Sequence, residues 1–182
     1  HVWRVRKDWA TGDLTVDAAN YYGYTSAGDV SAEQIAAVKT QYQYDWENWP
    51  AEWGAPYTDV DGVAGYSAAA GDIPGYPGAD QTMWTIANDV PYVVNDAGVV
   101  VDTMSTAPNL YGADPIGIEL QITLWGYAFG AGDPLGNMIF KKATMKYTGM
   151  PNSPAGAKME DLYFTQWSDP DLGTYTDDYV GC

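Results

Sequence analysis

Hydrophobic residues recur at helical spacing in the first fifty residues of the chain. Ile35, Val38, Tyr42 and Trp49 fall on one side of a helical projection, which is typical of a helix packed on a larger body. Ser31 and Gln34, three residues later, have the spacing of a capping box, and the Trp49-Pro50 pair supplies a stop. The pattern therefore predicts a helix that begins at Ser31, with a shorter helical turn over residues 17–22.

From residue 84 onward the period changes to two, which is typical of half-buried strands. The clearest run, residues 116–129, reads IGIELQITLWGYAF. It predicts a long strand whose polar face begins at Glu119 and becomes aromatic at Trp125 and Tyr127. Residues 84–86 and 99–101 favour shorter strands. Residues 137–149 and 157–167 favour two more strands, joined as an antiparallel pair by a turn rich in Pro, Gly, Asn and Ser.

Gly and Pro punctuate residues 51–83 too often for a regular element, so a long loop is expected there. We therefore expect a single domain, itself a piece of a longer chain. It divides into a helical segment (1–50), a long Gly/Pro/Asp loop (51–83) and an antiparallel β body (84–182). The predicted fold class is mainly β, with an antiparallel β-sandwich-like body and a packed N-terminal helix; the alternative is α+β.

The amino-acid composition limits the kinds of partner that the protein is expected to bind. The 182 residues include 24 Asp and Glu against 8 Lys and Arg, a net charge of −16, while 46% are hydrophobic. Such a chain has enough apolar residues for a folded core, and its negative field repels phosphate backbones and anionic lipid. We expect no nucleic-acid partner, and no membrane insertion because no apolar run reaches the length of a span. The single cysteine, Cys182, excludes an internal disulfide and leaves open a partner beyond the chain.

The long loop carries a first candidate metal site. Asp59 and Asp61, in DVDGVAG, have the Asp-x-Asp beginning of an oxygen-ligand calcium loop, and Asp72 follows in the same segment. An EF-hand would need Asp or Asn at Val63 and an acidic residue at Ala70, so that motif is excluded. A looser calcium site and a solvated acidic turn both remain open.

The end of the chain carries a second candidate. WSDPDLGTYTDDYVGC places four carboxylates within ten positions, with none of the basic residues among them: Asp169, Asp171, Asp177 and Asp178. A divalent cation would remove their mutual repulsion, and Ca²⁺ suits an all-oxygen site better than Zn²⁺, which prefers His and Cys. The alternative is surface acidity, because Asp-Pro-Asp also makes good turns.

Residues of the long predicted strand suggest two further functions, carbohydrate binding and glycoside hydrolysis. Trp125 and Tyr127 are candidate ligand-binding residues for a carbohydrate-binding module, because aromatic rings stack on sugars. Glu119 is the candidate acid of a glycoside hydrolase, although nothing fixes the second carboxylate that such enzymes use. The only histidine is His1, which disfavours a Ser-His-Asp or Cys-His arrangement.

Several phrases together resemble a group of large secreted or surface proteins of Bacteroidota-type bacteria that end in type IX sorting tails. They are HVWRVRKDWATGDL (1–14), GADQTMWTIANDV (78–90), YGADPIGIELQITLWGYA (111–128), DPLGNMIFKKATMKYTG (133–149) and FTQWSDPDLGTYTDDYVGC (164–182). The resemblance covers most of the chain and implies an extracellular or cell-surface location. It assigns no reaction. The triplet DTM, 102–104, resembles the short O-glycosylation signal of such bacteria and makes Thr103 a candidate glycosylation site.

Together these observations predict an extracellular structural or adhesive module of a larger cell-surface or filament protein. We expect it to be non-catalytic and stabilised by Ca²⁺. Its expected partners are other copies of itself or neighbouring modules of the same chain, and glycans in the alternative of a carbohydrate-binding module.

Overall fold

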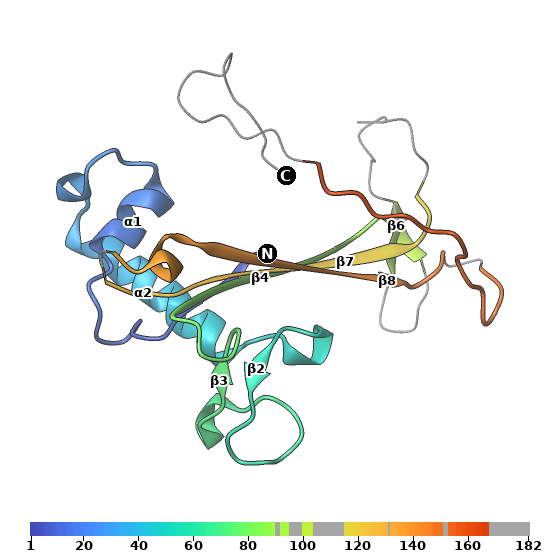
Figure 1. The fold of residues 1–182 in the computed structure, drawn as a ribbon, viewed down its shortest axis with the longest axis horizontal. Helices are drawn as coiled ribbons and strands as arrows, with labels where there is room; N and C mark the ends of the chain where they lie inside the picture. The colour runs from blue at the N-terminus through green and yellow to red at the C-terminus, as the bar shows by residue number, and fades with distance from the viewer. Residues whose placement is uncertain (90–91, 95–99, 104–114, 131, 151–152, 168–182) are drawn as a thin grey trace.

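The computed structural model describes residues 1–89, 92–94, 100–103, 115–130, 132–150 and 153–167. Its main element is an antiparallel sheet in the order β1-β4-β7-β8, built from β1 (Trp3–Arg6), β4 (Gln81–Asn88), β7 (Ile118–Gly126) and β8 (Ile139–Tyr147) (Figure 1). Two small antiparallel pairs accompany it: β2 (Tyr57–Thr58) with β3 (Ile73–Pro74), and β5 (Tyr92–Val94) with β6 (Val100–Thr103). The helices are α1 (Thr15–Tyr22) and α2 (Ala32–Glu47). The predicted antiparallel, strand-rich fold with an N-terminal helix is confirmed.

Helix α2 begins where the capping box predicts. The Gln34 N–H donates to Ser31 Oγ at 3.2 Å, and the Ser31 N–H donates to Gln34 Oε1 at 2.9 Å, so two otherwise unpaired backbone donors are satisfied. The helix ends at Glu47, just before Trp49-Pro50. It lies against the outer edge of the sheet, where Asp45 Oδ2 accepts the Arg4 N–H at 2.9 Å.

Two hydrophobic clusters share this helix. Val38 and Tyr42 pack with α1 and the segment before it, through Leu14 and Ala18. About two turns after Tyr42, just beyond the end of the helix, Trp49 packs with three residues of the sheet and of the loop: Val5, Ala55 and Trp84. Because α2 contributes side chains to one cluster and leads directly into the other, it joins α1 to the sheet.

The sheet buries the face that the sequence marks as polar. Thr123 lies opposite Trp84 in the register of β7 and β4, and the two side chains are only 6% and 1% exposed. Leu120, Ile122 and Leu124 point to the other face, and none of them is buried. The alternation along β7 is confirmed, but its polar face meets the core. The bulk of that core comes from Trp84 on β4 and Trp49 after α2.

Two predicted segments differ from the structure. The loop over residues 51–83 contains β2, β3 and two short 3-10 turns, Ala51–Trp53 and Ala68–Ala70, and β4 already begins at Gln81. The strand predicted over 157–167 is wrong, since these residues are not in a strand. Its expected partner, β8, pairs with β7 instead, because the nine-residue register between them satisfies one edge of β8.

The described helices include no candidate for a membrane-spanning segment. Among the described residues, neither helix combines the length and the apolar character that crossing a bilayer requires.

Candidate functional site

The pair formed by β2 and β3 brings the loop carboxylates together. Tyr57 lies opposite Pro74 and Thr58 opposite Ile73, so the residue after β2, Asp59, and the residue before β3, Asp72, become neighbours. One carboxylate oxygen from each of Asp59, Asp61 and Asp72 lies within 4.8 Å of the other two. The three residues that the sequence predicts as loop ligands therefore converge, although Asp72 is thirteen positions after Asp59.

Backbone N–H groups fix the central carboxylate. Asp72 is buried, and its two oxygens accept the Val60 N–H at 2.9 Å and the Ser67 N–H at 2.8 Å. These hydrogen bonds, that from Val60 first, hold the pKa of Asp72 below its ordinary value. Asp72 is therefore an anion over a wide pH range.

The other two carboxylates are exposed and bend the loop around Asp72. Asp59 Oδ1 accepts the Gly62 N–H at 2.6 Å, and Asp61 Oδ1 accepts the Val63 N–H at 2.8 Å. Gly62 has a φ of 73°, a conformation that glycine adopts without strain, so the tight turn depends on it. The second oxygen of each carboxylate has no hydrogen bond to the described residues.

The donor set fits a hard cation. Ca²⁺ binds oxygen at about 2.3–2.6 Å, so oxygens on opposite sides of one ion lie roughly 5 Å apart, and the observed spacing of at most 4.8 Å is compatible with shared coordination. No His or Cys belongs to this group, which disfavours Zn²⁺. Three carboxylates supply half or fewer of the oxygens that Ca²⁺ takes, so water or backbone carbonyls would complete the shell.

Several predicted residues lie outside the described part of the chain. The four terminal carboxylates are among them, so the second calcium site stays a prediction: Asp169, Asp171, Asp177 and Asp178. Thr103 ends β6 opposite Tyr92 in the backbone register, and the placement of its side chain is likewise outside the description.

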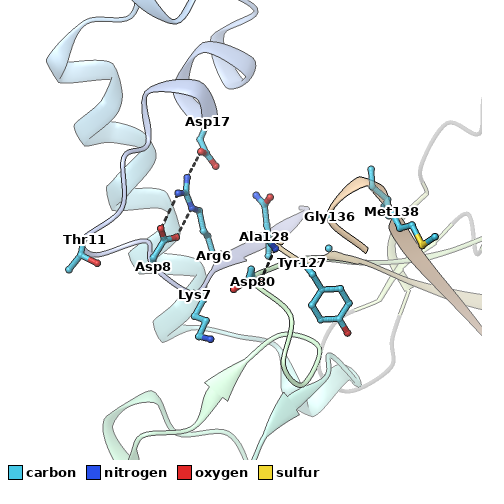
Figure 2. A pocket seen from close by; sticks show the side chains of 13 residues that line it. Arg6, Lys7, Asp8, Thr11, Asp17, Asp80, Tyr127, Ala128, Gly136 and Met138 are labelled. Carbon is cyan, nitrogen blue, oxygen red and sulfur yellow. Dashed lines mark hydrogen bonds and ion pairs between the residues drawn. The ribbon is translucent and has the colours of Figure 1, made fainter. Parts of the chain in front are cut away.

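The two predicted aromatic ligand residues occupy different settings. Trp125 stacks on Tyr76, with ring centroids 3.9 Å apart, and on Phe140, at 5.5 Å, so its indole is already engaged by the protein. Tyr127 packs edge-on against Phe140 at 5.8 Å and lies 5.7 Å from the Phe129 ring, and it is one of the residues that line an open cavity (Figure 2). Both rings are half-buried, and only Trp125 has a closely stacked partner.

This cavity has a volume of about 710 Å³ and lies between the first turn of the chain and the start of β8. Arg6, Lys7, Asp80 and Tyr127 are among the residues that line it, and Figure 2 shows the Tyr127 ring pointing away from Arg6 and Lys7. Arg6 donates to Asp8 Oδ1 at 2.6 Å and to Asp17 Oδ2 at 2.6 Å, and the hydrogen bond from Arg6 lowers the pKa of Asp8. The sequence offered no signal for this group, because its members come from separate elements.

Glu119 has a partner that is not a carboxylate. Its Oε1 accepts a hydrogen bond from Gln121 Nε2 at 3.0 Å, and Gln121 Nε2 also donates to the Trp53 carbonyl at 2.9 Å. Across the sheet, Glu119 lies opposite Asn88 on β4 and Lys146 on β8. The glycoside hydrolase alternative therefore still rests on Glu119 alone.

Comparison of the chain with known protein families, with characterised proteins and with solved structures gives no match. The functional argument accordingly rests on the residues and their geometry.

Proposed function

We propose that this protein is an extracellular structural or adhesive module of a larger cell-surface or filament protein, stabilised by Ca²⁺ and without catalytic activity. The observation that carries the proposal is the convergence of Asp59, Asp61 and Asp72 at the base of the β2–β3 pair. The resemblance of the chain to type IX-sorted surface proteins supports the location.

A cation at this place would stabilise the segment between β2 and β3. Three negative charges within a few ångströms repel one another, and the backbone N–H groups around Asp72 compensate only part of that repulsion. A cation that binds the folded loop and not the unfolded chain stabilises the protein by mass action. A rigid loop of this kind is consistent with a structural module.

Calcium binding can be tested on the whole chain. At a free Ca²⁺ concentration 100-fold above the dissociation constant, linkage predicts about 2.7 kcal/mol of added stability, which corresponds to a rise in Tm of roughly 5–10 °C relative to EDTA. Differential scanning calorimetry measures the shift, and isothermal titration calorimetry measures the binding. The variant Asp61→Asn should lose the shift.

The matched control is Asp29→Asn, which removes one exposed carboxylate from a short turn outside the cluster and should keep the full shift. Equal Tm values in Ca²⁺ and EDTA, with no metal found by elemental analysis, would reject the calcium proposal. A shift that survives Asp61→Asn but disappears in Asp171→Asn would move the site to the terminal carboxylates.

A second candidate function, carbohydrate binding, is favoured by the cavity at Tyr127. Sugar sites combine an aromatic ring with carboxylate and basic groups, and this cavity offers Tyr127 beside Asp80 and Lys7. On a glycan array, the wild-type protein should bind at least one neutral polysaccharide. Tyr127→Ala should weaken that binding about tenfold, while Tyr44→Ala, an exposed ring on α2, should not. An array without any signal would reject this candidate.

A further inference from the structure

The second face of the sheet carries a group of apolar side chains that the described residues cover only in part. Met83 on β4, Ile122 and Leu124 on β7 and Met145 on β8 share it, and none of these side chains is buried by the described residues. At one end of the same face, Ile139 is 81% exposed. Contiguous apolar surface of this kind marks an interaction site in a folded protein. We call these five residues the open face.

A second apolar surface lies in the segment of residues 158–167. Tyr163 and Trp167 are 87% and 79% exposed, and Leu162 and Phe164 are also exposed. No hydrogen bond connects this segment to the other described residues. Figure 1 shows it running on the side of the sheet away from β2 and β3, which is the side of the open face. The apolar side chains of the segment are thus exposed in the single copy, and those of the open face are only half-buried, apart from the exposed Ile139.

The edge strand β8 is basic, with Lys141 on the open face and two further lysines on the opposite face, whereas the segment is acidic on balance. Lys141, Lys142 and Lys146 lie on β8, the edge strand of the sheet, and none forms an ion pair with the described residues. The segment carries Glu160 and Asp161, which are exposed and equally without ion pairs there, and one basic residue, Lys158. In a chain with a net charge of −16, contact between two copies is repulsive unless basic groups of one meet acidic groups of the other. The edge of β8 provides such a place.

We propose that the open face and the β8 edge bind segment 158–167 of a second copy of this chain. Each copy carries both halves of the contact, so a two-fold arrangement uses them twice and closes without leaving either half exposed. The inference rests on the proposed function, because it names the partner of the structural module.

A charge-exchange series tests the contact. Multi-angle light scattering and analytical ultracentrifugation should find a dimer of the wild-type chain. Reversing the charge on β8 with Lys141→Glu and Lys142→Glu should raise the dissociation constant of the dimer at least tenfold. Reversing the charge on the segment with Glu160→Lys and Asp161→Lys should have the same effect. The four substitutions combined should restore association to within about threefold, which a loss of folding would not do. A wild-type monomer at all concentrations, or no restoration, would overturn the proposal.

Cysteine cross-linking distinguishes a second copy from closure within one copy. In a Cys182→Ser background, Ile122→Cys with Phe164→Cys should give a covalent dimer on mild oxidation. A monomer with an internal disulfide would overturn the proposal in favour of closure by the chain's own segment. The control pair replaces Phe164→Cys by Val16→Cys, a 60% exposed position on α1, and should not cross-link specifically.

The same measurements in Ca²⁺ and in EDTA separate this inference from the proposed function. A monomer that still gains stability from Ca²⁺ would overturn the dimer and leave the calcium-stabilised module standing. A dimer that is indifferent to Ca²⁺ would support the interface and count against the metal.

Discussion

Asp45 is the residue at which burial and charge conflict most directly. Its side chain is 0% exposed, yet it accepts hydrogen bonds from the Arg4 N–H at 2.9 Å, from Gln41 Nε2 at 2.9 Å and from His1 Nε2 at 3.0 Å. Burial is the largest cause of its raised pKa, and the hydrogen bond from Arg4 opposes that shift. Asp45 thus ties α2 to the edge of β1 at an electrostatic cost.

The raised pKa of Asp45 predicts a pH dependence. The folded protein binds this proton more tightly than the unfolded chain, so the stabilising contribution is present below the ordinary pKa of 3.8 and is lost as pH rises through the folded pKa. In Asp45→Asn, which keeps an oxygen for Arg4 and cannot ionise, that loss is absent. Urea unfolding from pH 3.5 to 6.5 should therefore show the stability difference shifting in favour of the variant as pH rises, by about 1.4 kcal/mol for each unit of pKa shift. Parallel curves would contradict the assignment.

At the scale of elements, local sequence signals determine α2 more firmly than any strand. Its capping box uses residues three positions apart, so the signal is complete within one turn of the chain. A strand needs a partner from elsewhere. Segment 157–167 has a strand-like composition and forms no strand, although one side of the edge strand β8 has no partner in the described sheet. Asp161, with a φ of 55°, bends the segment out of the extended conformation that a strand requires.

The capping box also gives a stability prediction. Ser31→Ala removes the acceptor for the Gln34 N–H and should lower the free energy of unfolding by about 1 kcal/mol. Thr40→Ala on the exposed side of the same helix is the control, since its hydroxyl only bonds back to the Ala36 carbonyl. Chemical denaturation followed by circular dichroism measures both. An equal effect of the two substitutions would mean that the cap is not specifically stabilising.

At the scale of the whole molecule, α2 connects two hydrophobic clusters and the sheet presents its remaining apolar face outward. The exposed carboxylates keep copies apart over most of the surface, whereas the lysines of β8 offer an attractive edge. This division of charge agrees with a module that associates at one defined face. The charge-exchange series described above tests it directly.

The sequence by itself determined the helix beginning at Ser31 and the alternation along β7. These are short-range properties, fixed by residues a few positions apart. Only the tertiary structure decided that Thr123 faces the core while Ile122 faces outward, and that Asp72 joins Asp59 and Asp61. Alternation marks two faces of a strand without saying which one is covered, because the covering residues, Trp84 and Trp49, lie far away in the chain.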